Sequence, residues 1–267
     1  MLTVVMRFPL VLTSLCLVAI VASIASCSSP KPEIVKVRPV SGNPSFGATA
    51  AFLSSGDYQP TMEWPRKRAG DLLGEVNLQK DLLPRGRHAR KYRRSMRPRY
   101  ITIHSTQNFS VGADARKHSL ALKNGALRAY KHKDGNRIGY LVWHYSVDES
   151  VAVQHLPTNE QGEHADFDGP GNNYSIGIEM CENRGNSRSR TIDRTAKLTA
   201  YLMHQKGIPL SNVVPHYHWA RKGLEKPHKN CPHYLLDNGR PGKKWKWFQG
   251  RVKHYHNQIT STSPRVV

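Results

Sequence analysis

Acidic residues are scarce in this chain of 267 residues, where 19 aspartates and glutamates face 40 lysines and arginines. The formal net charge at pH 7 is therefore +21. A basic excess of this size favours polyanionic partners but does not determine a fold. Nucleic acid is the usual polyanion, yet the sequence contains no zinc-finger or single-strand-binding motif. We therefore expect no nucleic-acid partner.

Cysteine is rare as well, because the chain contains four. Cys16 and Cys27 lie near the N-terminus, so Cys181 and Cys231 remain for a folded domain. These two could form a disulfide in an oxidising compartment. They could also be a core thiol and a metal ligand, and the histidines around Cys231 favour this second interpretation.

One long apolar run, at residues 8–21, follows the single charge of Arg7. Small residues then lead to Cys27, which is the pattern of a bacterial lipoprotein signal covering residues 1–27. Cleavage before Cys27 would leave its sulfur acylated, whereas an ordinary signal peptide or an uncleaved membrane anchor are the alternatives. Because Ser28 rather than an aspartate follows, we expect a lipid anchor in the outer membrane facing the periplasm, if the cell is Gram-negative.

Composition divides the remaining chain into three segments. Residues 28–65 are rich in serine, proline, glycine and alanine, which predicts a flexible tether. Residues 66–98 form a basic lead-in, and its arginines crowd toward residue 99. This charge run is either a solvated face or a patch that holds an anionic polymer. Residues 99–262 are long enough for one globular core and contain no internal repeats.

Strand and helix patterns alternate in this last segment and predict an α/β fold. We expect strands at residues 100–103, 138–147, 151–154 and 175–181, with the second and third paired through a turn. We expect helices at residues 114–123, 191–206 and 244–259. Leu120 and Leu122 are apolar positions of the first helix. Thr191 can cap the second helix, and Gly207 ends it.

Several residues that could bind a metal stand at the ends of strand-like runs. His104 and His216 each follow such a run, and Cys231 lies in the loop after His216. A catalytic zinc ion usually has three protein ligands of these types and leaves a fourth position for water. Glu179 alternates with apolar neighbours in its strand, so it faces away from them. It is either a general base or one half of a structural ion pair.

Four motifs resemble those of the zinc-dependent N-acetylmuramoyl-L-alanine amidases found in phage endolysins, bacterial wall hydrolases and peptidoglycan recognition proteins. They are ITIHST at 101–106, SIGIEMC at 175–181, HYHW at 216–219 and KNCPH at 229–233. The resemblance covers residues from about 99 to about 236. It implies a central mixed β-sheet flanked by helices. It also implies hydrolysis of the amide bond between N-acetylmuramic acid and L-alanine in peptidoglycan.

The same resemblance implies roles for individual residues. One zinc ion per chain would be bound by His104, His216 and Cys231. The other residues that it implies are Glu179 as general base, Lys229 as catalytic lysine, and His144 and His164 along the substrate groove. Peptidoglycan or its fragments would be the substrate, and we expect a monomer.

The sequence departs from the family pattern in two places. The loop before Cys231 is longer than in the endolysins, and it contains His218 and His228 as alternative ligands. Trp143 stands where some relatives place a catalytic tyrosine, which favours Glu179 as the base. The alternative function is a lipoprotein that binds or senses peptidoglycan without cutting it. An unrelated zinc peptidase is disfavoured because no His-Glu-x-x-His helix is present.

Overall fold

The computed structural model describes residues 66–129, 138–220 and 229–259, all within the unit Gln59–Val267. The predicted signal segment with Cys27, the predicted tether and the alternative ligand His228 lie outside the described residues. Their predictions therefore stay predictions. In the part of the chain that is described, no helix has the length and apolar character needed to cross a membrane.

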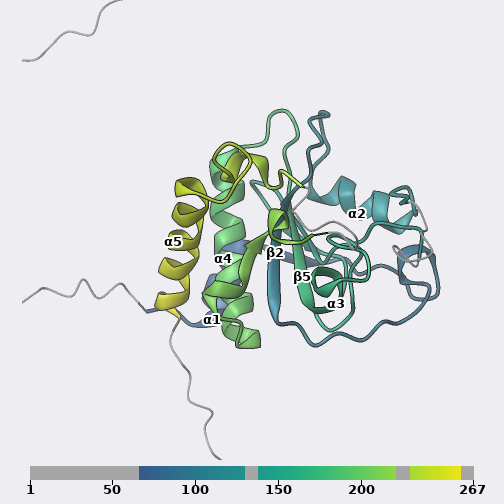
Figure 1. The fold of residues 1–267 in the computed structure, drawn as a ribbon, viewed down its shortest axis with the longest axis horizontal. Helices are drawn as coiled ribbons and strands as arrows, with labels where there is room; N and C mark the ends of the chain where they lie inside the picture. The colour runs from purple at the N-terminus through teal and green to yellow at the C-terminus, as the bar shows by residue number, and fades with distance from the viewer. Residues whose placement is uncertain (1–65, 130–137, 221–228, 260–267) are drawn as a thin grey trace, which may run out of the picture. The chain divides into compact units, whose positions relative to one another are not determined.

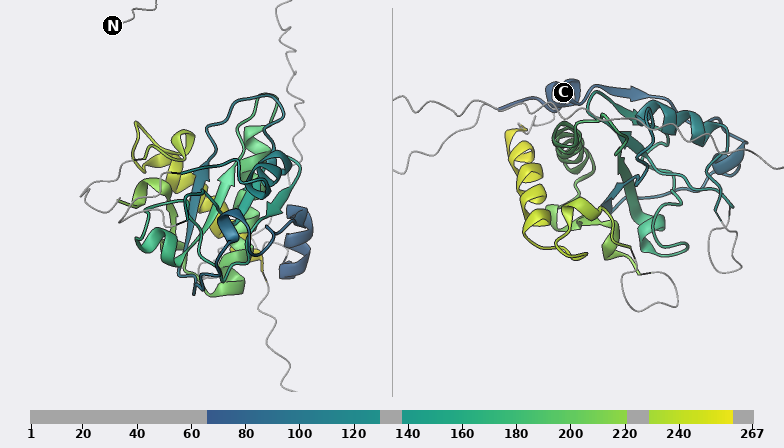
Figure 2. Two further views of the ribbon diagram at one scale, coloured as in Figure 1. Left: turned by 90° about the vertical axis from the view of Figure 1, so that its right-hand side faces the viewer. Right: turned by 90° about the horizontal axis from the view of Figure 1, so that it is seen from above.

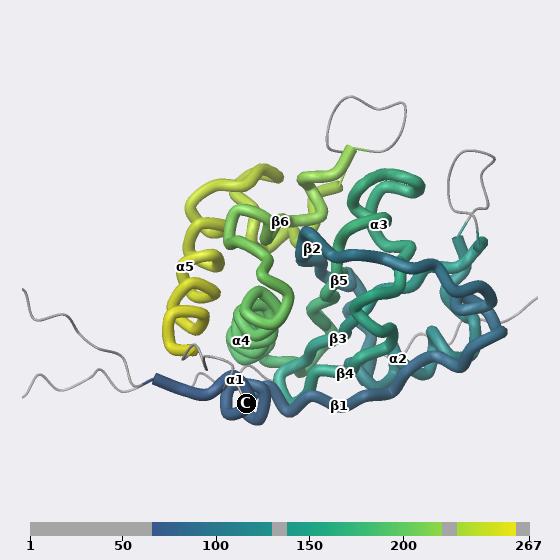
Figure 3. The backbone as a smooth tube through the Cα atoms, turned by 90° about the horizontal axis from the view of Figure 1, so that it is seen from below, coloured from purple at the N-terminus to yellow at the C-terminus, as the bar shows by residue number. Residues whose placement is uncertain are grey.

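The described residues form a six-stranded sheet with the strand order β1-β4-β3-β5-β2-β6 (Figure 3). The strands are β1 (Leu78–Lys80), β2 (Tyr100–Ser105), β3 (Tyr145–Val147), β4 (Ala152–Gln154), β5 (Ser175–Met180) and β6 (Val213–Pro215). Among these strands β3 and β4 pair antiparallel and the other neighbours pair parallel. The mixed sheet predicted from the family resemblance is therefore confirmed.

Helices cover both faces of this sheet (Figures 1 and 2). One face carries α1 (Ala69–Val76), α4 (Arg188–Lys206) and α5 (Lys243–Gln258), and the other carries α2 (Ala115–Lys123) and α3 (Pro170–Tyr174). Short 3-10 helices occupy His88–Arg90, Leu210–Asn212, His216–His218 and His233–Leu235. The arrangement is the flanked α/β domain that the sequence predicts.

The two central strands, β2 and β5, have chemically different faces. Their isoleucines are fully buried in the main apolar core, together with residues of α4 and α5. Successive side chains of a strand point to opposite faces, so the residues that alternate with the isoleucines face the α2 and α3 side. His104 and Glu179 belong to this second set and lie opposite each other in register. Burial of the isoleucines therefore determines where these two polar groups point.

One predicted strand is much shorter in the structure. The pattern at residues 138–147 predicts one continuous strand, but only Tyr145–Val147 joins the sheet, as β3. Upstream of β3, Val142 forms an isolated antiparallel bridge with Glu163 instead. Val142 and Trp143 are buried there in a second cluster that also contains Leu122 and Leu156, and Ile138 and Tyr140 pack against it partly buried.

Two details of the predicted helices are wrong. Thr191 does not cap α4, because that helix begins earlier, after Ser187, and the Thr191 hydroxyl donates to the Ser187 carbonyl at 3.0 Å. Leu120 is 51% exposed, so only Leu122 of the predicted apolar pair is buried. Gly207 does end α4, where its φ of 64° gives the left-handed turn that glycine adopts without strain.

The basic lead-in is part of the folded domain, so the predicted boundary at residue 99 is wrong. Leu72 and Val76 of α1 are fully buried in the main core, and β1 pairs with β4 at the sheet edge. Arg90 is also buried, where its guanidinium donates to the Glu160 carboxylate at 2.8 and 2.7 Å. The charge run is therefore not simply a solvated face.

Candidate active site

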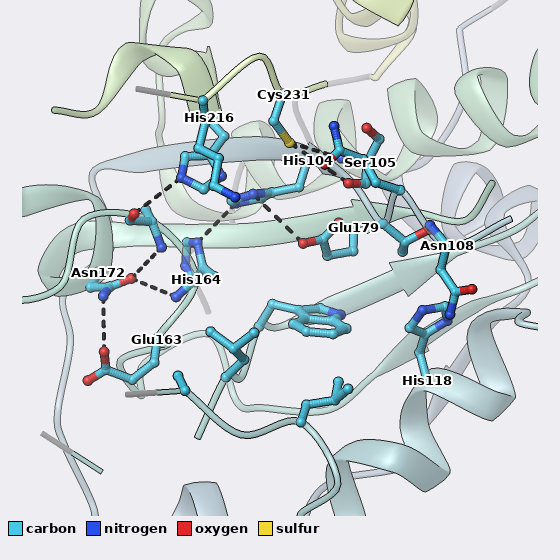
Figure 4. Close-up of a pocket in the computed structure, with 18 of the residues that line it drawn as sticks. His104, Ser105, Asn108, His118, Glu163, His164, Asn172, Glu179, His216 and Cys231 are labelled. Atoms are coloured by element: carbon cyan, nitrogen blue, oxygen red, sulfur yellow. Dashed lines mark hydrogen bonds and ion pairs between the residues drawn. The ribbon is translucent and has the colours of Figure 1, made fainter. Parts of the chain in front are cut away.

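The predicted metal ligands come together on the α2 and α3 side of the sheet (Figure 4). His104 is near the end of β2, His216 begins the 3-10 helix directly after β6, and Cys231 lies in a later loop. One potential ligand atom from each lies within 4.8 Å of those from the other two, and all three residues are buried. The parallel pairing of β2 and β6 explains this, because it places both strand ends at one edge.

The chemistry of this cluster fits a zinc ion. Burial, followed by the charges of His216 and His164, lowers the pKa of His104 well below its usual value, so its imidazole is neutral. Burial raises the pKa of the Cys231 thiol to about 12, which means that a thiolate here needs a nearby cation. The Ser105 backbone N–H already points at the Cys231 sulfur, at 3.3 Å. Histidine nitrogen and cysteine thiolate both bind zinc, and three protein ligands are the usual number at a catalytic zinc site.

His164 contacts His104 directly. Its Nε2 lies 3.3 Å from the Ser175 carbonyl oxygen, which can only accept, so Nε2 carries the proton. Burial lowers the pKa of His164 well below its usual value, so Nδ1 has no proton. His104 Nε2, 3.0 Å away, therefore donates to His164 Nδ1. This assignment leaves the lone pair of His104 on Nδ1, as a metal ligand requires.

Glu179 lies beside the same cluster, and its Oε1 is 3.8 Å from His104 Nδ1. Its Oε2 is buried and has no hydrogen-bond partner among the described residues. Burial and, after it, the charge of Glu182 raise the pKa of Glu179 to about 8, against the opposing charge of Lys229. A buried carboxyl with an unpaired oxygen at a cavity suits a proton-transfer role.

A cavity of about 500 Å³ opens over these groups. Its walls include the three candidate ligands, Glu179, Lys229 and His164. His118, Leu127, Leu141 and Trp143 also line the cavity. Lys229 is exposed. The cavity therefore combines polar, ionisable and apolar lining residues, as substrate sites commonly do.

The structure places His144 outside this cavity, and the predicted groove contact must be corrected. Its side chain is fully buried. Nδ1 accepts from the Gly177 backbone N–H at 3.0 Å, and Nε2 donates to the Glu160 carbonyl at 2.8 Å. Nδ1 thus joins the segment before β3 to β5, and Nε2 joins the same segment to the loop at Glu160. His164 does line the cavity, but its ring nitrogens are engaged with His104 and Ser175.

The structure also decides two alternatives that the sequence left open, a disulfide between the two cysteines and His218 as a ligand. Cys181 and Cys231 are both free and buried, so the alternative of a disulfide between them is wrong. His218 is not in the ligand cluster, and its ring instead packs against Trp219 with centroids 4.7 Å apart. The register of the HYHW motif therefore brings His216, not His218, to His104.

Sequence reasoning missed Glu182 and Asn172. Glu182 accepts from the Gln107 backbone N–H at 2.9 Å and lies 3.5 Å from His233 Nε2. An acid two residues after the strand that carries Glu179 is a signal that could have been noted. Asn172 is 2% exposed and contacts the segment around His164. Asparagine beside glycine is so common in turns that no local signal distinguishes it.

Comparison with known proteins finds one matching family. The family model described as N-acetylmuramoyl-L-alanine amidase matches residues 94–234. The amidase XlyA of Bacillus subtilis (strain 168) is 40% identical over 163 residues, which are 61% of this chain and 48% of XlyA. The amidase CwlH of the same organism is 35% identical over 191 residues, which are 71% of this chain and 66% of CwlH. The chain thus spans 48% and 66% of the length of these two relatives.

Solved structures agree with this match. A mutant endolysin from Bacillus subtilis superposes with a TM-score of 0.55 at 38% identity, covering 66% of this chain and 99% of the endolysin chain. The catalytic domain of XlyA superposes with a TM-score of 0.54, also at 38% identity and with the same coverage. The similarity therefore extends over nearly the whole of a catalytic domain.

Proposed function

Because this chain belongs to the N-acetylmuramoyl-L-alanine amidase family, we propose that it hydrolyses the amide bond between N-acetylmuramic acid and L-alanine in peptidoglycan. The observation that carries the proposal is the cluster of His104, His216 and Cys231, with ligand atoms within 4.8 Å of one another beside a buried carboxyl. We propose that these three residues bind one zinc ion. A zinc ion there would supply an activated water and polarise the scissile carbonyl.

Glu179 is the group placed to move protons in this reaction. Its unpaired Oε2 can take the proton of the attacking water. The same carboxyl can then pass that proton to the nitrogen of the leaving L-alanine, which must be protonated to depart as an amine.

Lys229 supplies positive charge at the same cavity. Hydrolysis of an amide places negative charge on the carbonyl oxygen in the transition state. A cation aimed at that oxygen stabilises the transition state more than the substrate, and such a contribution is often about 3 kcal/mol. Lys229 is therefore proposed as the residue that stabilises the oxyanion.

The function is tested by digesting purified peptidoglycan with the protein, with and without a zinc chelator. We expect free glycan strands and peptides with a new L-alanine amino terminus, identified by mass spectrometry. The chelator should abolish the products, and added zinc should restore them. New reducing sugar ends or cuts between peptide residues would refute the amidase assignment. Binding to peptidoglycan without any products would support the non-catalytic alternative.

The N-terminal pattern supports a further proposal about location. Small residues before Cys27, after a long apolar run, support lipid attachment at that cysteine. The anchored domain would then act on peptidoglycan from a bacterial membrane, and Ser28 favours the outer membrane with the domain in the periplasm. Labelling of cells with palmitate, followed by membrane fractionation, tests both parts.

A further inference from the structure

Two adjacent residues support the two histidines of the proposed metal site. His164 Nδ1 accepts a hydrogen bond from His104 Nε2 at 3.0 Å. The carbonyl oxygen of Ala165, the next residue, accepts from His216 Nε2 at 3.1 Å. Metal-binding histidines commonly donate their second ring N–H in this way, and the acceptor sets the orientation of the ring. The position of one short backbone segment therefore orients both rings.

That backbone segment is held by the side chain of Asn172, on α3 (Figure 4). Asn172 Oδ1 accepts from the backbone N–H groups of both His164 and Ala165, each at 2.8 Å. Asn172 Nδ2 donates to the Phe167 carbonyl at 2.6 Å and to Glu163 Oε2 at 3.2 Å. One buried amide thus contacts the segment on both sides of the two supporting residues.

Asn172 is itself held firmly. The Asp166 carboxylate accepts from the backbone N–H groups of Gly171 and Asn172, each at 2.8 Å. A side chain at position 171 would come within 2.8 Å of the Ala165 side chain and 2.9 Å of Trp219, so only glycine lets α3 approach this closely. Glu163 in turn forms an ion pair with Arg94. The chain of contacts leads from the surface to both candidate ligands.

We propose that Asn172 is a positioning residue that orients His104 and His216 together for metal binding. It does so through His164 and Ala165 and touches neither the metal nor the substrate. The inference rests on the proposed function, because it takes these two histidines as ligands. Loss of the amide should leave both rings with less defined orientations and should weaken zinc binding.

The test compares Asn172→Ala with Asn173→Ala. Asn173 is the matched control because it lies next to Asn172 on α3, and its side-chain amide also donates to a backbone carbonyl, that of Asp168 at 2.7 Å. Zinc dissociation constants are measured by competition with a chromophoric chelator, and the cobalt-substituted proteins are compared by visible spectroscopy. Removing such a supporting contact typically weakens metal binding about 10- to 100-fold.

We expect Asn172→Ala to weaken zinc binding at least about tenfold and to change the cobalt spectrum, with Asn173→Ala within about threefold of the wild type. Equal losses in both variants, or a folded Asn172→Ala protein that binds zinc like the wild type, would overturn the inference. If the wild type itself binds no zinc, the proposed function fails instead.

A second variant decides the matter if Asn172→Ala does not fold by circular dichroism. His164→Phe keeps the backbone N–H that Asn172 holds, but it removes the ring nitrogen that accepts from His104. We expect at least about tenfold weaker zinc binding for this variant too. Zinc affinity within about threefold of the wild type would overturn the inference.

Discussion

Replacing His144 should change how the stability of the domain depends on pH. Burial lowers the pKa of His144 to about 4, and the hydrogen bond to the Glu160 carbonyl only partly opposes this shift. Protonation would place a hydrogen on Nδ1, directly against the Gly177 N–H that this atom accepts. The native state therefore keeps the ring neutral, whereas the unfolded chain titrates near 6.5.

The size of the effect follows from these two pKa values. Above about pH 6.5, His144 is neutral in both the native and the unfolded state. The contribution of this residue to the free energy of unfolding is then complete. As the pH falls from about 6.5 to about 4, the unfolded state takes up a proton that the native state refuses, so the native state loses stability. Between about pH 7 and about pH 4.5 the loss from this one residue is about 2.5 kcal/mol.

The variant His144→Asn removes the titration but keeps an amide oxygen near the position of Nδ1 to accept from Gly177. It should be about 1–3 kcal/mol less stable than the wild type near pH 7, because the bond to Glu160 is lost. The difference in the free energy of unfolding between the wild type and the variant should be smaller by about 2.5 kcal/mol near pH 4.5. Other buried histidines, such as His155 with a pKa lowered to about 3 by burial, are present in both proteins. Their contributions to the pH dependence of stability therefore cancel in the comparison.

The assay is denaturant unfolding of both proteins at several pH values, with a chelator present so that metal binding does not contribute. If the two proteins lose the same stability between about pH 7 and about pH 4.5, the buried neutral state assigned to His144 is wrong. A widening difference at acidic pH would refute the reasoning even more directly.

Four other predictions concern the site, the lead-in and the N-terminus. Glu179→Gln should keep zinc and fold but lose turnover by about a hundredfold or more, measured on labelled peptidoglycan. Lys229→Ala should lower turnover comparably with little change in substrate binding, provided that its zinc content is unchanged. Arg90→Gln should cost about 3–5 kcal/mol in urea unfolding, because its buried carboxylate partner is left unpaired, whereas exposed Arg93→Gln should change little. Cys27→Ser should abolish palmitate labelling, and equal labelling would place the anchor elsewhere.

The sequence predicted the local elements well and the distant contacts poorly. Alternating isoleucines identify β2 and β5 because burial of one strand face is visible at a spacing of two residues. The apolar residues before β3 gave a false strand, because residues buried in any cluster produce the same local pattern. The lead-in was misassigned for a related reason. Charged residues dominate the composition of the lead-in. Whether the Arg90 side chain points into the domain depends on its partner Glu160, which is 70 positions away.

The candidate ligands could be selected from the sequence because each stands in its own short motif. Such a motif consists of neighbouring residues and can be recognised without the tertiary structure. The sequence by itself therefore determined the α/β class and offered the residue types of the proposed zinc site and the candidate base. Only the tertiary structure decided that His216 rather than His218 meets His104, that His144 joins two chain segments outside the cavity, and that Asn172 holds both ligand supports. The physical reason is that these roles depend on hydrogen-bond partners from separate elements, and parallel strand pairing brings those partners together only after folding.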